Sequence, residues 1–129
     1  MYKRQHQAVR ARRAASKDGV LLDLKMAREG EVPFDAASFD MAVIDDTQGS
    51  FANRPPALRA TVLANLRLAL RVGGRIEMVE GLGSTGLFAK ATPRPTGYDA
   101  VAELEAAGFR PVRVLAEVTS FRFVEGLSL

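Results

Sequence analysis

Two adjacent carboxylates, Asp45 and Asp46, are the best candidates for chemistry in this sequence. They close a nearly continuous apolar run that begins at Phe39, which predicts a strand buried on both faces. In a sheet with parallel strands, ligands bind at the edge formed by the carboxyl ends of those strands. We therefore predict that both carboxylates, with the adjacent Thr47, belong to a binding site. The alternative is that they are turn residues that solvate the end of the strand.

A second candidate is the stretch Gly81 to Gly86, which has the spacing G-x-G-x-x-G directly after a predicted strand. A dinucleotide-binding loop of this kind needs a helix that starts in the loop and a second strand that ends in an acidic residue. Both are missing, because Pro93 and Pro95 interrupt the next segment and Glu103 falls inside a later predicted helix. We interpret the stretch as a flexible glycine loop. A nucleotide-binding oxidoreductase is the alternative.

The composition excludes other kinds of catalytic site. The sequence contains one histidine, His6, and no cysteine. A disulfide, a thiolate metal site and a serine, histidine and carboxylate arrangement therefore cannot be assembled. No metal site and no catalytic residue are predicted.

A strand, a helix and a second strand must position the two carboxylates. Between Pro55 and Gly73, apolar residues recur at steps of three and four, which predicts a helix with one buried side. These apolar residues are Leu58, Val62, Leu63, Leu66, Ala69 and Leu70. The helix is predicted to end at Gly73-Gly74, where glycine can adopt a left-handed backbone, and a strand follows as far as Glu80. This order predicts a βαβ unit with neighbouring parallel strands.

Further elements are predicted on both sides of this unit. They are a helix at 6–17, a short strand at 20–24, a helix at 98–107 closed by Gly108, and two strands at 111–117 and 120–126. The last two strands alternate in polarity and are joined by about two residues, which predicts an antiparallel hairpin with one buried face.

Three short motifs occur in order along this part of the chain. They are the Val32-Pro33-Phe34 turn, the Phe39-Asp40 pair and the Leu70-Arg71-Val72-Gly73-Gly74 turn. Together they resemble the second half of a class I S-adenosylmethionine-dependent methyltransferase, although Val72 stands where the family usually has proline. The resemblance implies an α/β fold, a partial Rossmann-like methyltransferase sheet of parallel strands with a C-terminal antiparallel hairpin. It implies one truncated domain over residues 1–129.

The resemblance also implies S-adenosylmethionine as cofactor and an unidentified methyl acceptor. Because the methyl group of a sulfonium is already activated, such an enzyme aligns donor and acceptor and needs little acid–base catalysis. The cofactor-binding residues that the resemblance implies are Glu29, Asp45, Asp46 and Thr47. Glu29 would lie in the loop that approaches the adenine, and a solvated loop is the alternative.

The cofactor cradle of that family is expected to be incomplete here. The glycine-rich turn after the family's first strand and the acidic residue that ends its second strand are not found before Gln7. Met1 to Gln5 also resembles the translated end of a transposon used for sequencing libraries, which would be a non-native scar. We therefore expect an inactive fragment that does not bind S-adenosylmethionine at useful affinity. The exposed edge along Met41 to Ile44 predicts self-association. The alternative to a methyltransferase fragment is a non-catalytic α/β interaction module.

Composition and charge limit the other partners. A chain of 129 residues that is 47% hydrophobic and 26% charged is typical of one soluble domain. It has neither a signal peptide nor an apolar run of roughly 20 residues, so we expect a cytoplasmic protein without a membrane partner. Six of its basic residues precede the first acidic residue, Asp18, without aromatic residues among them after Tyr2. This pattern favours a solvated helix face over a nucleic-acid surface.

Overall fold

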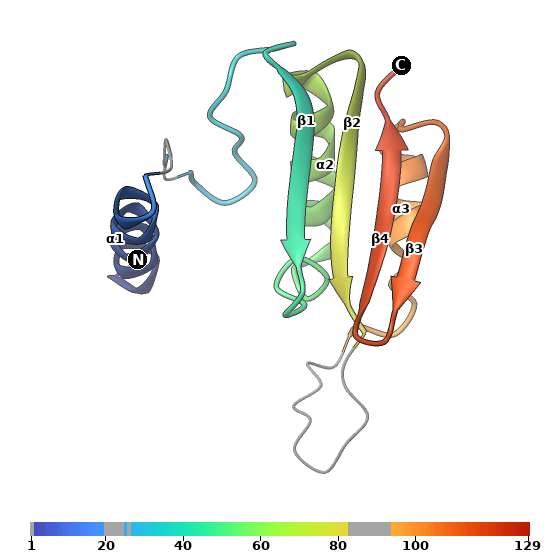
Figure 1. Cartoon of the computed structure of the whole chain (residues 1–129). Coiled ribbons are helices and arrows are strands. Elements are labelled where there is room, and N and C mark those ends of the chain that lie inside the picture. Colours follow the sequence, from blue (N-terminus) through green and yellow to red (C-terminus); the bar gives the residue numbers. More distant parts are fainter. Residues whose placement is uncertain (1, 20–24, 26, 83–93) are drawn as a thin grey trace.

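The computed structural model describes residues 2–19, 25, 27–82 and 94–129 (Figure 1). Within these ranges the elements are α1 (Tyr2–Lys17), β1 (Phe39–Asp46), α2 (Pro56–Ala69), β2 (Leu70–Gly81), α3 (Ala100–Ala106), β3 (Val112–Val118) and β4 (Phe121–Leu127). The strand predicted at 20–24, and residues 83–86 of the predicted glycine loop, lie outside the described residues. Helix α1 starts before the predicted His6 and lies apart from the sheet.

The four described strands form one sheet in the order β1-β2-β4-β3. Strands β1 and β2 are parallel, with Val43 opposite Glu77, whereas β4 is antiparallel to both β2 and β3. The predicted βαβ unit and the predicted C-terminal hairpin are therefore confirmed. The order also places β4 between β2 and β3, so the hairpin joins the sheet through its second strand.

Helix α2 ends earlier than predicted. Its last residue is Ala69, and Leu70 already has an extended backbone with φ −82° and ψ 142°. The N–H groups of Ala37 and Ser38 donate to the carbonyls of Leu68 and Ala69, both at 2.9 Å. The end of the helix is thus satisfied by the segment before β1, not by a glycine cap. Gly73 does have a positive φ of 85°, but it lies within β2.

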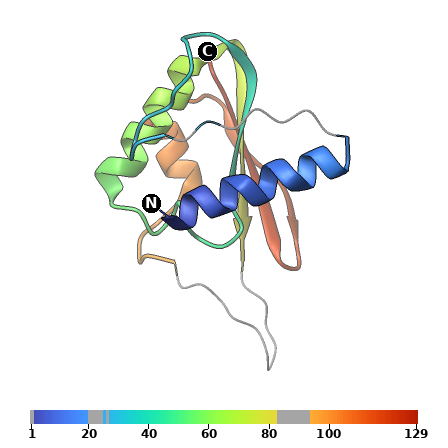
Figure 2. The same ribbon diagram turned by 90° about the vertical axis from the view of Figure 1, so that its left-hand side faces the viewer.

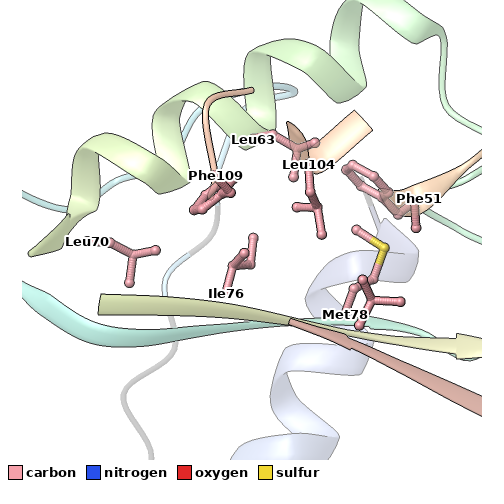
Figure 3. Close-up of a cluster of buried hydrophobic side chains, with 9 residues drawn as sticks. Phe51, Leu63, Leu70, Ile76, Met78, Leu104 and Phe109 are labelled. Carbon is pink, nitrogen blue, oxygen red and sulfur yellow. The ribbon is translucent and has the colours of Figure 1, made fainter. Parts of the chain in front are cut away.

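The hydrophobic core lies between the sheet and the two helices α2 and α3 (Figures 1 and 3). Its fully buried side chains include Leu63, Ile76, Met78, Leu104 and Phe109. These residues come from α2, β2, α3 and the loop after α3, so the core joins the βαβ unit to the hairpin. The predicted burial of Leu63 on one side of α2 is confirmed.

Both helices cover the same face of the sheet, and the other face is bare in the described part of the chain (Figure 2). In β1, Ala42 and Ile44 pack against the core, whereas Met41 is 48% and Val43 is 58% exposed. The prediction that β1 is buried on both faces is therefore wrong for the described residues, because no described helix packs on the second face. Strand β3 is also exposed along most of its length, so only β4 of the hairpin has the predicted buried side chains.

Of the helices that the structure describes, none combines the length and the apolar character needed to cross a membrane.

Candidate functional site

The carboxyl ends of β1 and β2 lie side by side, as a parallel pair requires. Asp45 is opposite Val79, and Asp46 is opposite Glu80. A Cβ atom built at Gly81 would overlap the carbonyl of Thr47, so only glycine allows the loop after β1 to pack directly on the end of β2. The structure therefore brings Asp45, Asp46 and Thr47 together at the predicted edge of the sheet.

Asp45 is exposed and held in place by its neighbour. Its Oδ1 accepts hydrogen bonds from the Thr47 Oγ1 at 2.7 Å and from the Thr47 backbone N–H at 3.1 Å. These two hydrogen bonds, the hydroxyl one first, lower the pKa of Asp45 below its ordinary value. Asp45 is therefore an ionised acceptor with a fixed direction, and its Oδ2 accepts no hydrogen bond from any described residue.

Asp46 faces the opposite side of the sheet and is fully buried. Its Oδ1 accepts from the backbone N–H of Phe51 at 2.7 Å, and Ala52 N–H lies 3.3 Å from its Oδ2. Burial raises the pKa of Asp46, although these two N–H groups and nearby Arg94 act in the opposite direction. Asp46 thus organises the turn after β1, and its carboxylate is shielded from solvent.

Glu80 is a site residue that the sequence did not single out as a binding group. It is fully buried at the end of β2, where its Oε1 accepts from Arg94 Nη1 at 2.6 Å and its Oε2 from Arg122 Nε at 2.7 Å. The Glu80 carboxylate raises the pKa of Arg122. Arg94 also donates to the carbonyl of Gly81. One buried carboxylate therefore fastens two segments that are far apart in sequence to the end of β2.

Arg59 connects α2, α3 and the turn after β1. Its Nη2 donates a hydrogen bond to Glu103 Oε1 at 2.6 Å. Its Nη1 donates to the carbonyls of Ala52 and Arg54 at 3.0 and 2.6 Å. It is only 6% exposed, and the hydrogen bond with Glu103 raises its pKa. A sequence signal was present, because Arg59 precedes Leu63 by four residues and so lies on the buried side of α2.

Tyr98 lies between the two arginines of this region. The Arg59 guanidinium carbon lies 5.1 Å, and that of Arg94 6.0 Å, from the centre of its ring. The Tyr98 hydroxyl donates to Met78 Sδ at 3.3 Å. Burial, followed by the nearby carboxylates, raises the pKa of Tyr98, so that its hydroxyl stays neutral at physiological pH.

Glu29 lies in the segment before β1, whereas the other three predicted site residues follow one another at the end of β1. It is exposed in a turn, and the next residue, Gly30, accepts a hydrogen bond from Asn65 Nδ2 of α2 at 2.9 Å. No hydrogen bond or ion pair among the described residues joins Glu29 to Asp45 or Thr47. Its role toward an adenine stays a prediction.

Among the described residues, this edge of the sheet supplies groups that can bind a ligand, and we identify no catalytic acid, base or nucleophile there. Asp45 offers an exposed anionic acceptor, whereas Asp46, Glu80 and Arg59 are occupied in holding the surrounding backbone. Within residues 2–19, 25, 27–82 and 94–129, no group of acidic or histidine side chains could hold a metal ion. The edge of the sheet is thus suited to orient a ligand that carries hydroxyl or ammonium donors.

Comparisons with known proteins show where this fold recurs. No family model matches the sequence, and no curated protein matches it. The chain superimposes on a SAM dependent methyltransferase from Aquifex aeolicus with a TM-score of 0.69 and 16% identity, over 92% of this chain and 62% of that chain. It thus spans less than two thirds of that protein.

Two further solved structures are similar. One is the S-adenosylmethionine-dependent methyltransferase SibL in its apo form, with a TM-score of 0.64, 18% identity and coverage of 91% of this chain and 39% of that chain. The other is the 16S rRNA methyltransferase RsmC of T. thermophilus in complex with AdoMet and guanosine, with a TM-score of 0.57, 16% identity and coverage of 92% and 26%. At these identities the likeness shows the fold alone.

Proposed function

We propose that this chain, which has the fold of class I S-adenosylmethionine-dependent methyltransferases, contributes to methyl transfer from S-adenosylmethionine to an unidentified acceptor. The observation that carries the proposal is the ionised, oriented carboxylate of Asp45 at the carboxyl end of the parallel strand β1. Ligands of α/β sheets bind at that edge. One of the similar structures, that of RsmC, is a complex with AdoMet.

The residues at this edge fit part of such a cofactor. S-adenosylmethionine carries ribose hydroxyls and an ammonium group, and the open Oδ2 of Asp45 can accept a hydrogen bond from either. Thr47 keeps Asp45 in one orientation through both its hydroxyl and its N–H. Asp46 positions the turn that starts at Thr47 by binding the N–H groups of Phe51 and Ala52. Asp45 and Thr47 are therefore the proposed contact residues, and Asp46 is a positioning residue.

Methyl transfer from S-adenosylmethionine depends on the alignment of donor and acceptor more than on proton transfer by the protein. When bound, S-adenosylmethionine supplies an activated methyl group, so the protein must hold the acceptor in line and keep water away. The buried ion pairs of Glu80 and Arg59 make the end of the sheet rigid without offering a free base. This agrees with a binding site that contains no described nucleophile.

We further propose that these 129 residues form only one wall of the cofactor site and are inactive alone. Strand β1 pairs only with β2 among the described strands, so the side of Asp45 away from β2 lacks a neighbouring strand there. The similar protein from Aquifex aeolicus is longer than this chain. We place the activity in the cytoplasm, in line with a sequence that contains no cysteine.

Amide chemical shifts recorded during a titration test the cofactor assignment. S-adenosylhomocysteine at millimolar concentration should shift the amides of Asp45 to Phe51, and Asp45→Asn should remove this response. Asp40→Asn is the matched control, because Asp40 is an exposed carboxylate near the other end of β1. Shifts that avoid the end of β1, or that survive Asp45→Asn, would contradict the assignment.

Calorimetry separates the cofactor assignment from the proposed inactivity. Micromolar binding of S-adenosylmethionine by the 129-residue chain would overturn the one-wall proposal and still support the cofactor. Quenching of nicotinamide fluorescence by the same chain would instead favour the oxidoreductase alternative.

A further inference from the structure

Helix α1 carries the strongest segregation of charge in the chain. It contains no acidic residue, and its six basic residues are Lys3, Arg4, Arg10, Arg12, Arg13 and Lys17. All 15 acidic residues of the chain lie after α1, where they outnumber the remaining basic residues. The positive charge of the protein is therefore concentrated on one helix, and an anionic partner is attracted to that helix and not to the rest of the chain.

The described part of α1 has no buried side. Figure 1 shows that the helix stands apart from the sheet. Between residues 7 and 17 every side chain is exposed except Ala8, Ala11 and Ala15, which are half-buried. A helix that belongs to a folded domain normally buries an apolar stripe, and a helix of 16 residues is only marginally stable without such packing. The solvated face that the sequence predicts for these cations thus lacks a packed face behind it.

Three of the cations form a stripe along α1. Arg10, Arg13 and Lys17 are spaced by three and four residues, so they lie on one side of the helix, and all three are exposed. Like charges at this spacing destabilise a helix. Among the residues that the structure describes, no carboxylate forms an ion pair with any of the three. A bound polyanion would neutralise this stripe and stabilise the helix.

The apolar side chains of α1 are too small for a membrane or an apolar groove. After Tyr2 its apolar residues are Ala8, Val9, Ala11, Ala14 and Ala15. A helix that lies in a membrane surface needs large apolar side chains such as leucine, phenylalanine or tryptophan opposite its charges, and a helix that enters a protein groove needs similar anchors. Electrostatic attraction is therefore the interaction that α1 can offer.

Two features of the described cations favour phosphates over acidic side chains. Arg12 lies about 200° around the helix from Arg10, so the positive charge occupies two opposite sides of α1. A helix in a nucleic-acid groove has phosphates along both sides, whereas a protein surface contacts one side. Three of the four cations between residues 7 and 17 are arginines, whose planar guanidinium binds two phosphate oxygens at once.

We propose that α1 binds the phosphate backbone of a nucleic-acid duplex. Arg10, Arg13 and Lys17 contact one row of phosphates, and Arg12 contacts the row on the other side of the groove. The seven residues from Arg10 to Lys17 span about 10 Å, and a duplex of that length carries about six phosphate charges. All four cations follow Gln5, so the proposal is independent of the origin of residues 1–5. It goes beyond the proposed methyl transfer and needs no bound cofactor.

Fluorescence anisotropy of a short labelled DNA duplex of mixed sequence tests the proposal on the full chain. The chain should bind at low salt, and the affinity should fall steeply as salt rises. Replacement of Arg10, Arg13 and Lys17 together by glutamine should weaken binding by about a hundredfold or more at low salt. It should also reduce the slope of log affinity against log salt by about 3. Glutamine has nearly the same helix propensity as the residues that it replaces, and circular dichroism verifies that α1 is retained.

A matched control removes three positive charges elsewhere. Arg28, Arg67 and Arg110 are exposed and lie outside α1, so their joint replacement by glutamine lowers the net charge by the same amount. This control variant should keep most of the affinity and the full salt dependence. Failure of the parent chain to bind, or equal losses in the two triple variants, would overturn the proposal.

Three further measurements sharpen the assignment. An RNA duplex of the same sequence distinguishes the source of the phosphates: tighter binding of DNA would support insertion of α1 into the major groove, and equal binding would support contact across the backbone. Polyglutamate that competes as strongly as the duplex would overturn the preference for phosphates. Added duplex should shift the amides of residues 7–17, and shifts confined to Asp45–Phe51 would also overturn the proposal. Loss of the α1 response and loss of the cofactor response are thus separate outcomes.

Discussion

Among the described residues, each face of the sheet carries a glutamate between two arginines, and the two triads differ in how exposed the arginines are. On the face that α2 and α3 cover, Glu80 is fully buried and meets Arg94 and Arg122 at 2.6 and 2.7 Å. On the other face, Glu125 is also buried, with 5% of its surface exposed, and meets Arg75 and Arg113 at 3.5 and 3.2 Å. The arginines of Glu80 are 24% and 30% exposed, against 50% and 67% for those of Glu125.

Both glutamates are buried, so the exposure of their arginine partners is what separates the two triads. A buried carboxylate with partly buried arginines forms a strongly coupled group, whereas ion pairs to exposed arginines are weakened by water. The same contrast holds for apolar side chains, because Ile76 and Met78 are fully buried while Val43 on the neighbouring strand is 58% exposed. The stability of the described fold should therefore come from the covered face.

The largest expected effect concerns two phenylalanines. Phe109 is fully buried on the covered face, and Phe109→Ala should lower the free energy of unfolding by about 3–5 kcal/mol, because it leaves a cavity. Phe121 is 40% exposed, and Phe121→Ala should cost less than about 1 kcal/mol. Urea unfolding of both variants measures this. Similar losses would show that the bare face is covered in solution.

The next effect compares the two triads directly. Glu80→Gln should lower the free energy of unfolding by about 3 kcal/mol, because it leaves two partly buried arginines without a counter-charge. Glu125→Gln is the matched change at a buried glutamate and should cost less, about 1 kcal/mol, because water can solvate the exposed Arg75 and Arg113 once their counter-charge is removed. Chemical denaturation in low and high salt measures both. A loss from Glu125→Gln that equals the loss from Glu80→Gln would contradict the comparison.

A smaller effect is expected at the arginine that joins the two covering helices. Arg59→Lys should cost about 2 kcal/mol, because an ammonium group cannot reproduce the fork that contacts Glu103 and the carbonyls of Ala52 and Arg54. Arg71→Lys, at an exposed site, should cost less than about 0.5 kcal/mol. Thermal unfolding of the two variants provides the measurement, and equal midpoints would disprove the role of Arg59.

The smallest effect is a pH dependence of opposite sign at two adjacent carboxylates. Burial raises the pKa of Asp46 in the folded state. Its contribution to the free energy of unfolding is therefore most favourable below the unfolded-state pKa of about 3.9, and it is lost as pH rises through the pKa of the folded state. The Thr47 hydrogen bonds lower the pKa of Asp45 in the folded state. Its contribution to the free energy of unfolding is therefore present above the unfolded-state pKa and is lost as pH falls through the pKa of the folded state.

Unfolding free energies of Asp45→Asn and Asp46→Asn between acid and neutral pH test this pair. Relative to the parent chain, Asp46→Asn should become more stable as pH rises, and Asp45→Asn should become less stable. Parallel profiles for the two variants would show that both carboxylates face the same environment.

Much of the fold could be predicted because its signals are local. The period of three to four residues in α2 and the apolar run of β1 identified the βαβ unit, and alternation identified the hairpin. The end of α2 could not be predicted from Gly73, because the carbonyls of its last turn bind Ala37 and Ser38, which lie before β1. A contact across so many residues leaves no periodic trace in the sequence.

The candidate site was predicted only in part for the same reason. The position of Asp45 and Asp46 at a strand end indicated a binding edge, and the structure brings them together with Thr47. The sequence did not identify the partners of Glu80, because Arg94 and Arg122 are 14 and 42 residues away from it. The role of Glu29 toward a cofactor remains a prediction.

The sequence by itself determined the order of the described strands and helices and the place of Asp45 and Asp46 at a strand end, because hydrophobic periodicity and turn chemistry act over a few residues. The tertiary structure alone decided that Asp46 is buried while Asp45 is exposed, that Glu80 joins three segments, and that both described covering helices pack on the same face of the sheet. These outcomes depend on which distant elements pack on each face, and burial then sets the strength of every charge and hydrogen bond there.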